Sequence, residues 1–188
     1  MRLFFAIGID PEAASAVRQL QSALQRKAPE PGIRWTSREQ LHYTLKFLGE
    51  VAEHRVAGCR EAARSAVQAS APFVLQLTGV GVFPATRTPH VLWVGAAAGA
   101  ELLAPLAARL DALLAPFGFE PEKRPFTPHL TIARIKGPSA EKAAARLLDE
   151  AQVATLATSR IDHMVLMHSR LSAQGACYSV VETYPFPE

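Results

Sequence analysis

Hydrophobic residues change their spacing along the first third of the chain. An apolar run from Leu3 to Ile9 predicts a strand, and Asp10 followed by Pro11 predicts a helix start, with the aspartate as N-cap and the proline at the first helical position. Apolar residues then return every three or four positions up to Pro29, which is typical of an amphipathic helix. These apolar positions are Ala13, Ala14, Val17, Leu20 and Leu24.

Residues 41–48 alternate between apolar and polar side chains. Successive side chains of a strand point to opposite faces, so this segment predicts a half-buried strand with one polar face. The apolar side holds Leu41, Tyr43, Leu45 and Phe47, and the polar side holds His42, Thr44 and Lys46.

The rest of the chain continues with helices and strands in a mixed order. We expect a helix over 53–67, strands over 73–78 and 91–95 joined by a loop over 79–89, a helix over 99–114, a strand over 126–135, a helix over 139–151 with Ser139 as N-cap, and closing strands over 161–168 and 177–184. Some strands follow one another directly, which favours an α+β fold over a purely parallel sheet. A strand, a helix and a strand with His-x-Thr occur once in each half. We therefore expect one bilobal domain over 1–188, in which two lobes of antiparallel sheet and helices, related by a pseudo-two-fold axis, share a central cleft.

Composition and charge exclude several classes of protein. Hydrophobic residues make up 49% and charged residues 20% of the 188 positions, which is typical of a globular chain with a sizeable core. No apolar stretch approaches the ~18 residues of a transmembrane helix, and the apolar start ends at Asp10-Pro11 without a signal-peptide cleavage site. The two cysteines have no paired spacing, so we expect a reducing, cytoplasmic location. A net charge of +3 is too small to establish nucleic-acid binding.

The motif His-x-Thr followed by an apolar residue occurs twice, at His42 and His129, 87 positions apart. In a strand, residues two apart share a face, so each histidine points the same way as Thr44 or Thr131. Two lobes facing each other would bring two imidazoles and two hydroxyls to one point. The pattern alone leaves open that these histidines are structural.

Such a set fits the chemistry of a ribose 2′,3′-cyclic phosphate. An imidazole titrates near neutral pH, so one ring can act as base while the other acts as acid. In-line displacement at phosphorus needs a base and an acid on opposite sides, and threonine hydroxyls can donate to the non-bridging oxygens. This chemistry requires no metal ion.

Longer segments around both motifs resemble a known family. The run LHYTLKFLGE at 41–50 and the run FTPHLTIAR at 126–134 are similar to the two signatures of the two-histidine (2H) phosphoesterases, and in particular to the RNA 2′,3′-cyclic phosphodiesterases, also called 2′-5′ RNA ligases. The runs RLFFAI at 2–7, GVFP at 81–84 and VLWVG at 91–95 are similar as well. The resemblance implies a bilobal α+β fold and hydrolysis of a 2′,3′-cyclic phosphate RNA end to a 2′-phosphate. It implies no cofactor and no metal, and an RNA partner such as a tRNA fragment. It also allows reversible, ATP-independent 2′-5′ ligation.

The same resemblance assigns roles to individual residues. His129 would be the proton acceptor toward the nucleophile, and His42 the proton donor toward O3′. Thr44, Thr131 and Arg134 would bind the phosphate. Strict strand alternation puts Arg134 on the face opposite to His129, so its role requires a bulge or the end of the strand.

Other positions depart from the family or have two interpretations. Tyr43 stands where relatives carry an aliphatic residue or threonine, and its side chain should face away from the cleft. His90 replaces an arginine that many relatives have, with Arg87 three residues earlier. Trp35 and Phe126 are candidates for stacking on RNA bases or for core packing. Lys46 shares the parity of His42 and is the strongest candidate for a basic RNA contact.

Three other functions compete with this hypothesis. A 2H enzyme could act on small nucleotide cyclic phosphates, a non-catalytic protein could bind RNA ends, and a metal-dependent phosphohydrolase could use other groups. We expect a monomer that associates with no membrane.

Overall fold

The computed structural model describes residues 1–85, 88–150, 155–172 and 175–188 and has an α+β fold. Its elements are β1 (Arg2–Gly8), α1 (Pro11–Lys27), β2 (Ile33–Trp35), β3 (His42–Glu50), α2 (Glu53–Val67), β4 (Phe73–Phe83), β5 (Val91–Ala96), α3 (Ala100–Leu114), β6 (Leu130–Ile135), α4 (Pro138–Glu150), β7 (Ala157–Ile161), β8 (His163–Ser172) and β9 (Gly175–Pro185). In this described part, no helix is long and apolar enough to cross a membrane.

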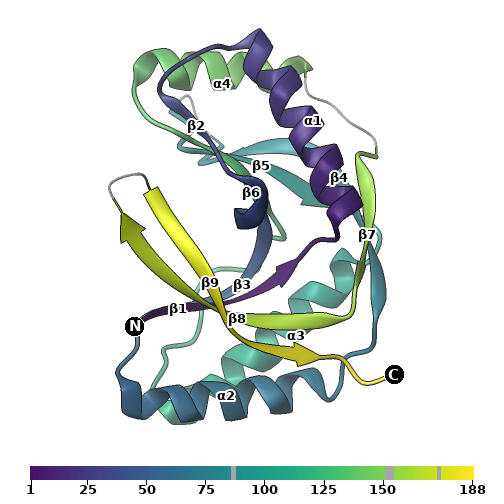
Figure 1. Cartoon of the computed structure of the whole chain (residues 1–188), viewed down its shortest axis with the longest axis vertical. Helices are drawn as coiled ribbons and strands as arrows, with labels where there is room; N and C mark the ends of the chain where they lie inside the picture. Colours follow the sequence, from purple (N-terminus) through teal and green to yellow (C-terminus); the bar gives the residue numbers. More distant parts are fainter. Residues whose placement is uncertain (86–87, 151–154, 173–174) are drawn as a thin grey trace.

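The strands form one antiparallel sheet made of two halves. One half has the order β3-β1-β8-β9 and the other the order β7-β4-β5-β6, with β2 beside β6. The halves join where β3 meets β6, at the single pair Tyr43–Leu130. Helices α1 and α4 cover the half that contains β6, and α2 and α3 cover the half that contains β3 (Figure 1). This arrangement confirms the expected α+β fold with two similar lobes.

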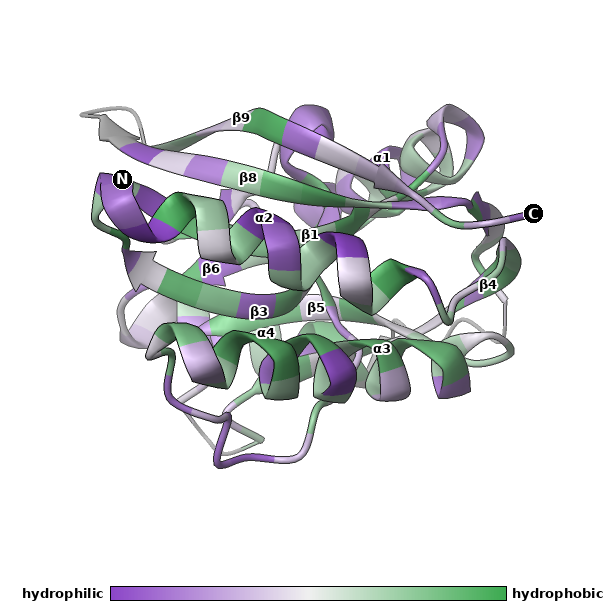
Figure 2. Cartoon of the chain, turned by 90° about the horizontal axis from the view of Figure 1, so that it is seen from below, coloured by the Kyte–Doolittle hydropathy of each residue, from purple (hydrophilic) through white to green (hydrophobic). Residues whose placement is uncertain are grey.

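The core fills the space between the sheet and these helices. Helices α2 and α3 lie side by side, and α3 is the more hydrophobic of the two along its length (Figure 2). The central strand β1 is buried on both faces, which explains why its sequence is an unbroken apolar run. Leu3, Phe5 and Ile7 join the main core, while Phe4 and Ala6 join a small second cluster on the opposite face.

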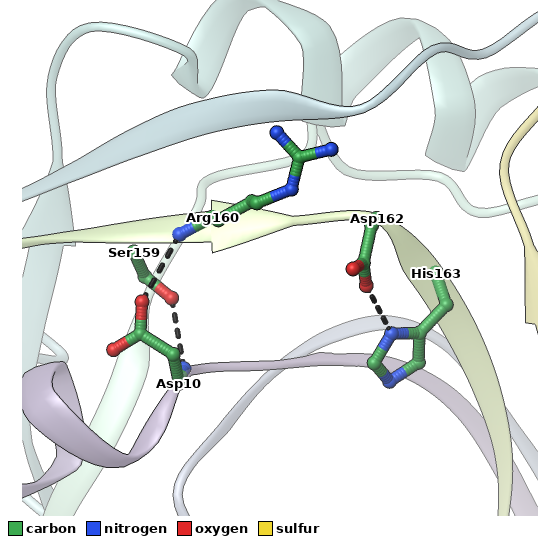
Figure 3. A network of polar contacts seen from close by, with 5 residues as sticks. All are labelled: Asp10, Ser159, Arg160, Asp162 and His163. Atoms are coloured by element: carbon green, nitrogen blue, oxygen red, sulfur yellow. Dashed lines mark hydrogen bonds and ion pairs between the residues drawn. The ribbon is translucent and has the colours of Figure 1, made fainter. Parts of the chain in front are cut away.

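The start of α1 is fixed by the aspartate predicted to cap it. Asp10 accepts a hydrogen bond from the Ala13 backbone N–H at 2.8 Å and another from the Arg160 backbone N–H at 3.1 Å. The Asp10 N–H in turn donates to the Ser159 hydroxyl at 2.9 Å, so α1 is tied to β7 (Figure 3). Nearby, the His163 side chain donates a hydrogen bond to Asp162, which lowers the pKa of that carboxyl.

The predicted end of the strand at 73–78 was wrong, because a glycine does not always end a strand. β4 continues through Gly79, which was expected to begin a loop, because Gly79 adopts φ +64° beside a shift in register against β5 and the pairing then resumes. Gly81 can lie in this strand because the Trp93 ring occupies the space of a side chain.

Other elements begin a few residues away from their predicted starts, and two short strands were not predicted. β6 begins at Leu130 rather than at Phe126, and α4 begins at Pro138, so Ser139 lies inside its first turn and donates to Glu30. The expected end of that helix, at 151, lies outside the described residues. The short strands β2 and β7 were not predicted from the sequence, because three to five residues show too little periodicity.

Candidate active site

Both His-x-Thr motifs lie beside each other at the junction of the two halves. The residues between histidine and threonine, Tyr43 and Leu130, pair with each other and are fully buried. Tyr43 donates its hydroxyl proton to the Gly95 carbonyl at 3.0 Å, which confirms that it faces away from the cleft. The histidines and threonines therefore project to the other side. His42, Thr44, His129 and Thr131 all line one cleft of about 520 Å³.

The two imidazoles are held in the same way. Nδ1 of His42 lies 2.7 Å from the Gln40 carbonyl oxygen, and Nδ1 of His129 lies 2.8 Å from the Thr127 carbonyl oxygen. A carbonyl oxygen only accepts, so each Nδ1 carries the proton and each neutral ring has its lone pair on Nε2. Nε2 of His42 is 3.1 Å from the Thr44 hydroxyl.

Aromatic rings fix the planes of both imidazoles. The Phe4 ring lies 5.0 Å from the His42 ring, and the Tyr178 ring meets His42 edge-on at 5.4 Å. The Phe83 ring meets His129 edge-on at 5.0 Å. Packing and a backbone hydrogen bond thus orient each ring before any ligand arrives, which is the preorganisation that catalysis by positioned groups requires.

His42 has a strongly shifted pKa. The pKa of His42 is lowered to about 4, chiefly by burial and to a smaller extent by positive charge at His129 and Arg134, while the hydrogen bond to Gln40 opposes the shift. Without a ligand, His42 is therefore neutral at pH 7.

A β-bulge turns Arg134 into the cleft. In β6, Ala133 pairs with Leu92 and Thr131 pairs with Trp93, so Ile132 is an extra residue. Ile132 and Ala133 are consequently both buried, and Arg134 lies on the cleft side with Thr131. Arg134 was expected to reach the face of His129 only if a bulge or the end of the strand interrupted the alternation, and this bulge provides that interruption.

A bulge at the equivalent position of β3 turns Lys46 away from the cleft. In β3, Lys46 pairs with Phe5 and Thr44 pairs with Ala6, so Leu45 is the extra residue. The expectation that Lys46 faces the cleft was wrong, because it assumed unbroken alternation.

The Lys46 side chain has partners on the buried face of the sheet. It is 7% exposed, its ammonium lies 2.5 Å from an Asp111 carboxylate oxygen, and it donates to the Glu120 carbonyl at 2.7 Å. Phe47 takes the cleft-facing position instead.

Of the two aromatic residues expected near the site, only one lines the cleft. Trp35 lines the cleft and also contacts the main core. Phe126 packs against the main core and is not among the residues that line the cleft. His90 is exposed, and its backbone bonds to Phe83 and Ile135 hold the connection before β5, whereas Arg87 lies outside the described residues.

Sequence reasoning missed several residues of the cleft. Phe4 and Tyr178 come from strands without a motif, and Arg2 lies with its guanidinium 5.0 Å from the centre of the Phe47 ring. Phe47 could have been found, because it follows His42 by five residues as Arg134 follows His129. The two bulges make these positions equivalent in the two halves. Among the described residues, no three His, Cys, Asp or Glu side chains form a group that could hold a metal ion.

Two related halves, each supplying one His-x-Thr motif to a shared cleft, are the arrangement that defines the 2H phosphoesterases. The chain belongs to the LigT-like phosphoesterase family, whose model matches residues 7–93 and again residues 94–178. Each match contains one motif.

Individual relatives agree with this assignment. The chain is 32% identical to the RNA 2′,3′-cyclic phosphodiesterase of Methanothermobacter thermautotrophicus over 98% of both chains, and 36% identical to that of Aeropyrum pernix over 76% of this chain and 80% of the relative. Among solved structures, TT0787 of Thermus thermophilus superimposes with a TM-score of 0.82 at 28% identity, over 99% of this chain and 98% of that one. Escherichia coli LigT in complex with 3′-AMP gives a TM-score of 0.77 at 25% identity, over 100% and 98%.

Proposed function

We propose that this protein is an RNA 2′,3′-cyclic phosphodiesterase that opens a 2′,3′-cyclic phosphate end to a 2′-phosphomonoester. The observation that carries the proposal is the pair of imidazoles from separate halves, each with Nδ1 bonded to a backbone carbonyl, in one cleft with two threonine hydroxyls and one guanidinium. The activity named for relatives at 32% and 36% identity supports it.

The proposed reaction is a single in-line displacement. Nε2 of His129 accepts a proton from water, the water oxygen bonds to phosphorus, the bond from phosphorus to O3′ breaks, and His42 gives its proton to O3′. Thr44, Thr131 and Arg134 donate hydrogen bonds to the non-bridging oxygens, where negative charge accumulates. With the 5′-hydroxyl of another RNA in place of water, the same steps form a 2′-5′ linkage without ATP.

The partner in this proposal is RNA, with tRNA fragments as one source of cyclic-phosphate ends. Trp35 and Phe47 offer aromatic surfaces in the cleft on which an unpaired base can stack. The proposal includes a monomeric protein, because the cleft is built from one chain. It also includes a cytoplasmic location, because Cys59 and Cys177 are both unpaired.

Incubation with a cyclic-phosphate-ended RNA in the presence of EDTA tests the reaction directly. The expected result is undiminished turnover and a 2′-phosphate product, because the groups placed on the phosphate are side chains of this chain. Product identity is read by ³¹P NMR and by resistance to a 3′-specific nucleotidase. Loss of activity in EDTA that returns with a divalent cation would support a metal-dependent phosphohydrolase instead, and a 3′-phosphate would mean that O2′ leaves.

The acid role of His42 makes a second prediction, because the ring must be protonated when the substrate is bound. A phosphate anion near His42 counteracts the positive charges of His129 and Arg134, so phosphate binding is expected to raise the pKa of His42 from about 4 toward neutrality. By linkage, binding of the anion between pH 7 and pH 5 is then accompanied by uptake of a proton at His42, in addition to any proton that inorganic phosphate itself gains in this range.

NMR titration of the His42 ring protons, with and without inorganic phosphate, measures this shift. The variant His129→Ala serves as a comparison, because removing the positive charge of His129 should also raise the pKa of His42. A His42 pKa that does not change when phosphate binds would contradict the assignment of this residue as the acid.

A further inference from the structure

Gln21 is a buried polar residue in the middle of α1, on the helix face that packs against the sheet. Its side chain is 1% exposed, and its carboxamide is fully paired. Nε2 donates to the Ile132 carbonyl at 2.8 Å and to the Thr36 carbonyl at 2.9 Å, and Oε1 accepts from the Arg18 guanidinium at 2.9 Å. Burying an amide is favourable only when its partners are in place, so this position is specified closely.

The two carbonyls that Gln21 binds belong to segments that supply residues to the cleft. Ile132 is the extra residue of the β6 bulge, and Thr36 directly follows β2 and lines the cleft. The Thr36 N–H also donates to the Ile132 carbonyl at 3.0 Å. Gln21 therefore bridges the end of β2 and the bulge of β6.

This bridge lies at a gap in the sheet. Along one edge of β6, the partner strand changes from β2, which pairs at Ala133, to β3, which pairs at Leu130. Between these pairs the ladder between strands is interrupted. The amide of Gln21, delivered by a helix from behind the sheet, supplies a hydrogen-bond donor at this gap.

From these contacts we infer that Gln21 is a positioning residue, which fixes the bulge at Ile132 and thereby directs Arg134 into the cleft toward the phosphate. The inference rests on the proposed function only in that Arg134 binds the phosphate group. Gln21 itself does not line the cleft, so it acts through the β6 backbone.

Gln21→Met tests the inference, because methionine has a similar length and no amide. Loss of a bridging hydrogen bond is expected to weaken inorganic phosphate binding roughly 3- to 10-fold, as measured by titration calorimetry. The same loss should be mostly absent when Arg134→Met is already present, because Gln21 acts through that residue. Catalytic turnover of a cyclic-phosphate-ended RNA should show the same non-additivity in kcat/KM.

Ser159→Ala is the matched control. Ser159 is also 1% exposed, and it accepts one hydrogen bond from the backbone of Asp10 at the N-terminal end of α1, where neither residue lines the cleft. This variant should lose stability in urea unfolding while its phosphate affinity stays unchanged. If Gln21→Met does not fold, as judged by circular dichroism, Gln21→Asn carries the same test, because its shorter amide cannot reach both carbonyls.

Two results would overturn the inference. One is unchanged phosphate affinity in the folded Gln21 variant, and the other is an equally large loss in the Arg134→Met background. The proposed function can fail separately. If phosphate binding by the unaltered protein depends on Arg134 and, through it, on Gln21, but the protein does not open a cyclic phosphate, the positioning role stands and the proposed reaction does not.

Discussion

Replacing either His42 or His129 by alanine is expected to lower turnover of an RNA with a 2′,3′-cyclic phosphate end by about 10²–10⁴-fold. Each ring supplies one proton transfer at a different oxygen, so neither can take over the role of the other. The rings lie at the cleft surface with Nδ1 on a carbonyl of their own segment, and their loss leaves the main core untouched. The measurement is single-turnover hydrolysis, with circular dichroism to confirm folding.

The double variant His42→Ala/His129→Ala tests whether the two rings act in the same step. Groups that act in one concerted step give strongly non-additive losses, so the double variant should be little slower than the slower single variant. His163→Ala is the control, because His163 is exposed and bonded to Asp162 outside the cleft. A single variant with nearly full activity would remove that histidine from the mechanism.

The positions of the two motif histidines in the cleft were predictable because they depend on local rules. Residues two apart in an extended segment share a face unless a bulge lies between them, and this places His42 with Thr44 and His129 with Thr131. The cap at Asp10 was equally local and was confirmed. The repeat of strand, helix and motif then sufficed to predict two related lobes.

The residues that follow each motif show where local rules fail. A bulge adds one residue to a strand, and nothing in the sequences Leu45-Lys46 and Ile132-Ala133 marks it. It reverses the expected facing of the residues that directly follow it, which buries Lys46 and exposes Arg134 to the cleft. The bulge in β6 is held by a helix residue more than one hundred positions away, Gln21, and such a contact exists only in the folded chain.

The two bulges also explain how a symmetric fold forms an asymmetric site. They bring the fifth residue after each histidine into the cleft, which is arginine in one half and phenylalanine in the other. Arg134 places a positive charge in the cleft, whereas Phe47 places an aromatic ring beside Phe4. The two halves thus have equivalent bulges but place side chains of different chemical character in the cleft.

Lys46→Met is expected to lower the free energy of unfolding by about 3 kcal/mol, the lower end of the range for breaking one side of a buried ion pair. The substitution removes the cation from Asp111, whose carboxylate is 18% exposed and then keeps only the hydrogen bond from the Glu122 N–H at 2.9 Å. Partial access of water to Asp111 limits the loss. Urea unfolding followed by circular dichroism measures the change.

The pair Lys46→Met/Asp111→Leu separates the burial of Lys46 from a role in RNA binding. Replacing both charges by apolar side chains leaves no uncompensated carboxylate, so most of the lost stability should return. At a temperature where both variants are folded, kcat/KM for the RNA end should stay close to that of the unchanged protein, because Lys46 faces away from the cleft. A rise in KM that depends on RNA length, with unfolding unchanged, would instead show that this lysine reaches the RNA and that β3 does not contain the bulge at Leu45.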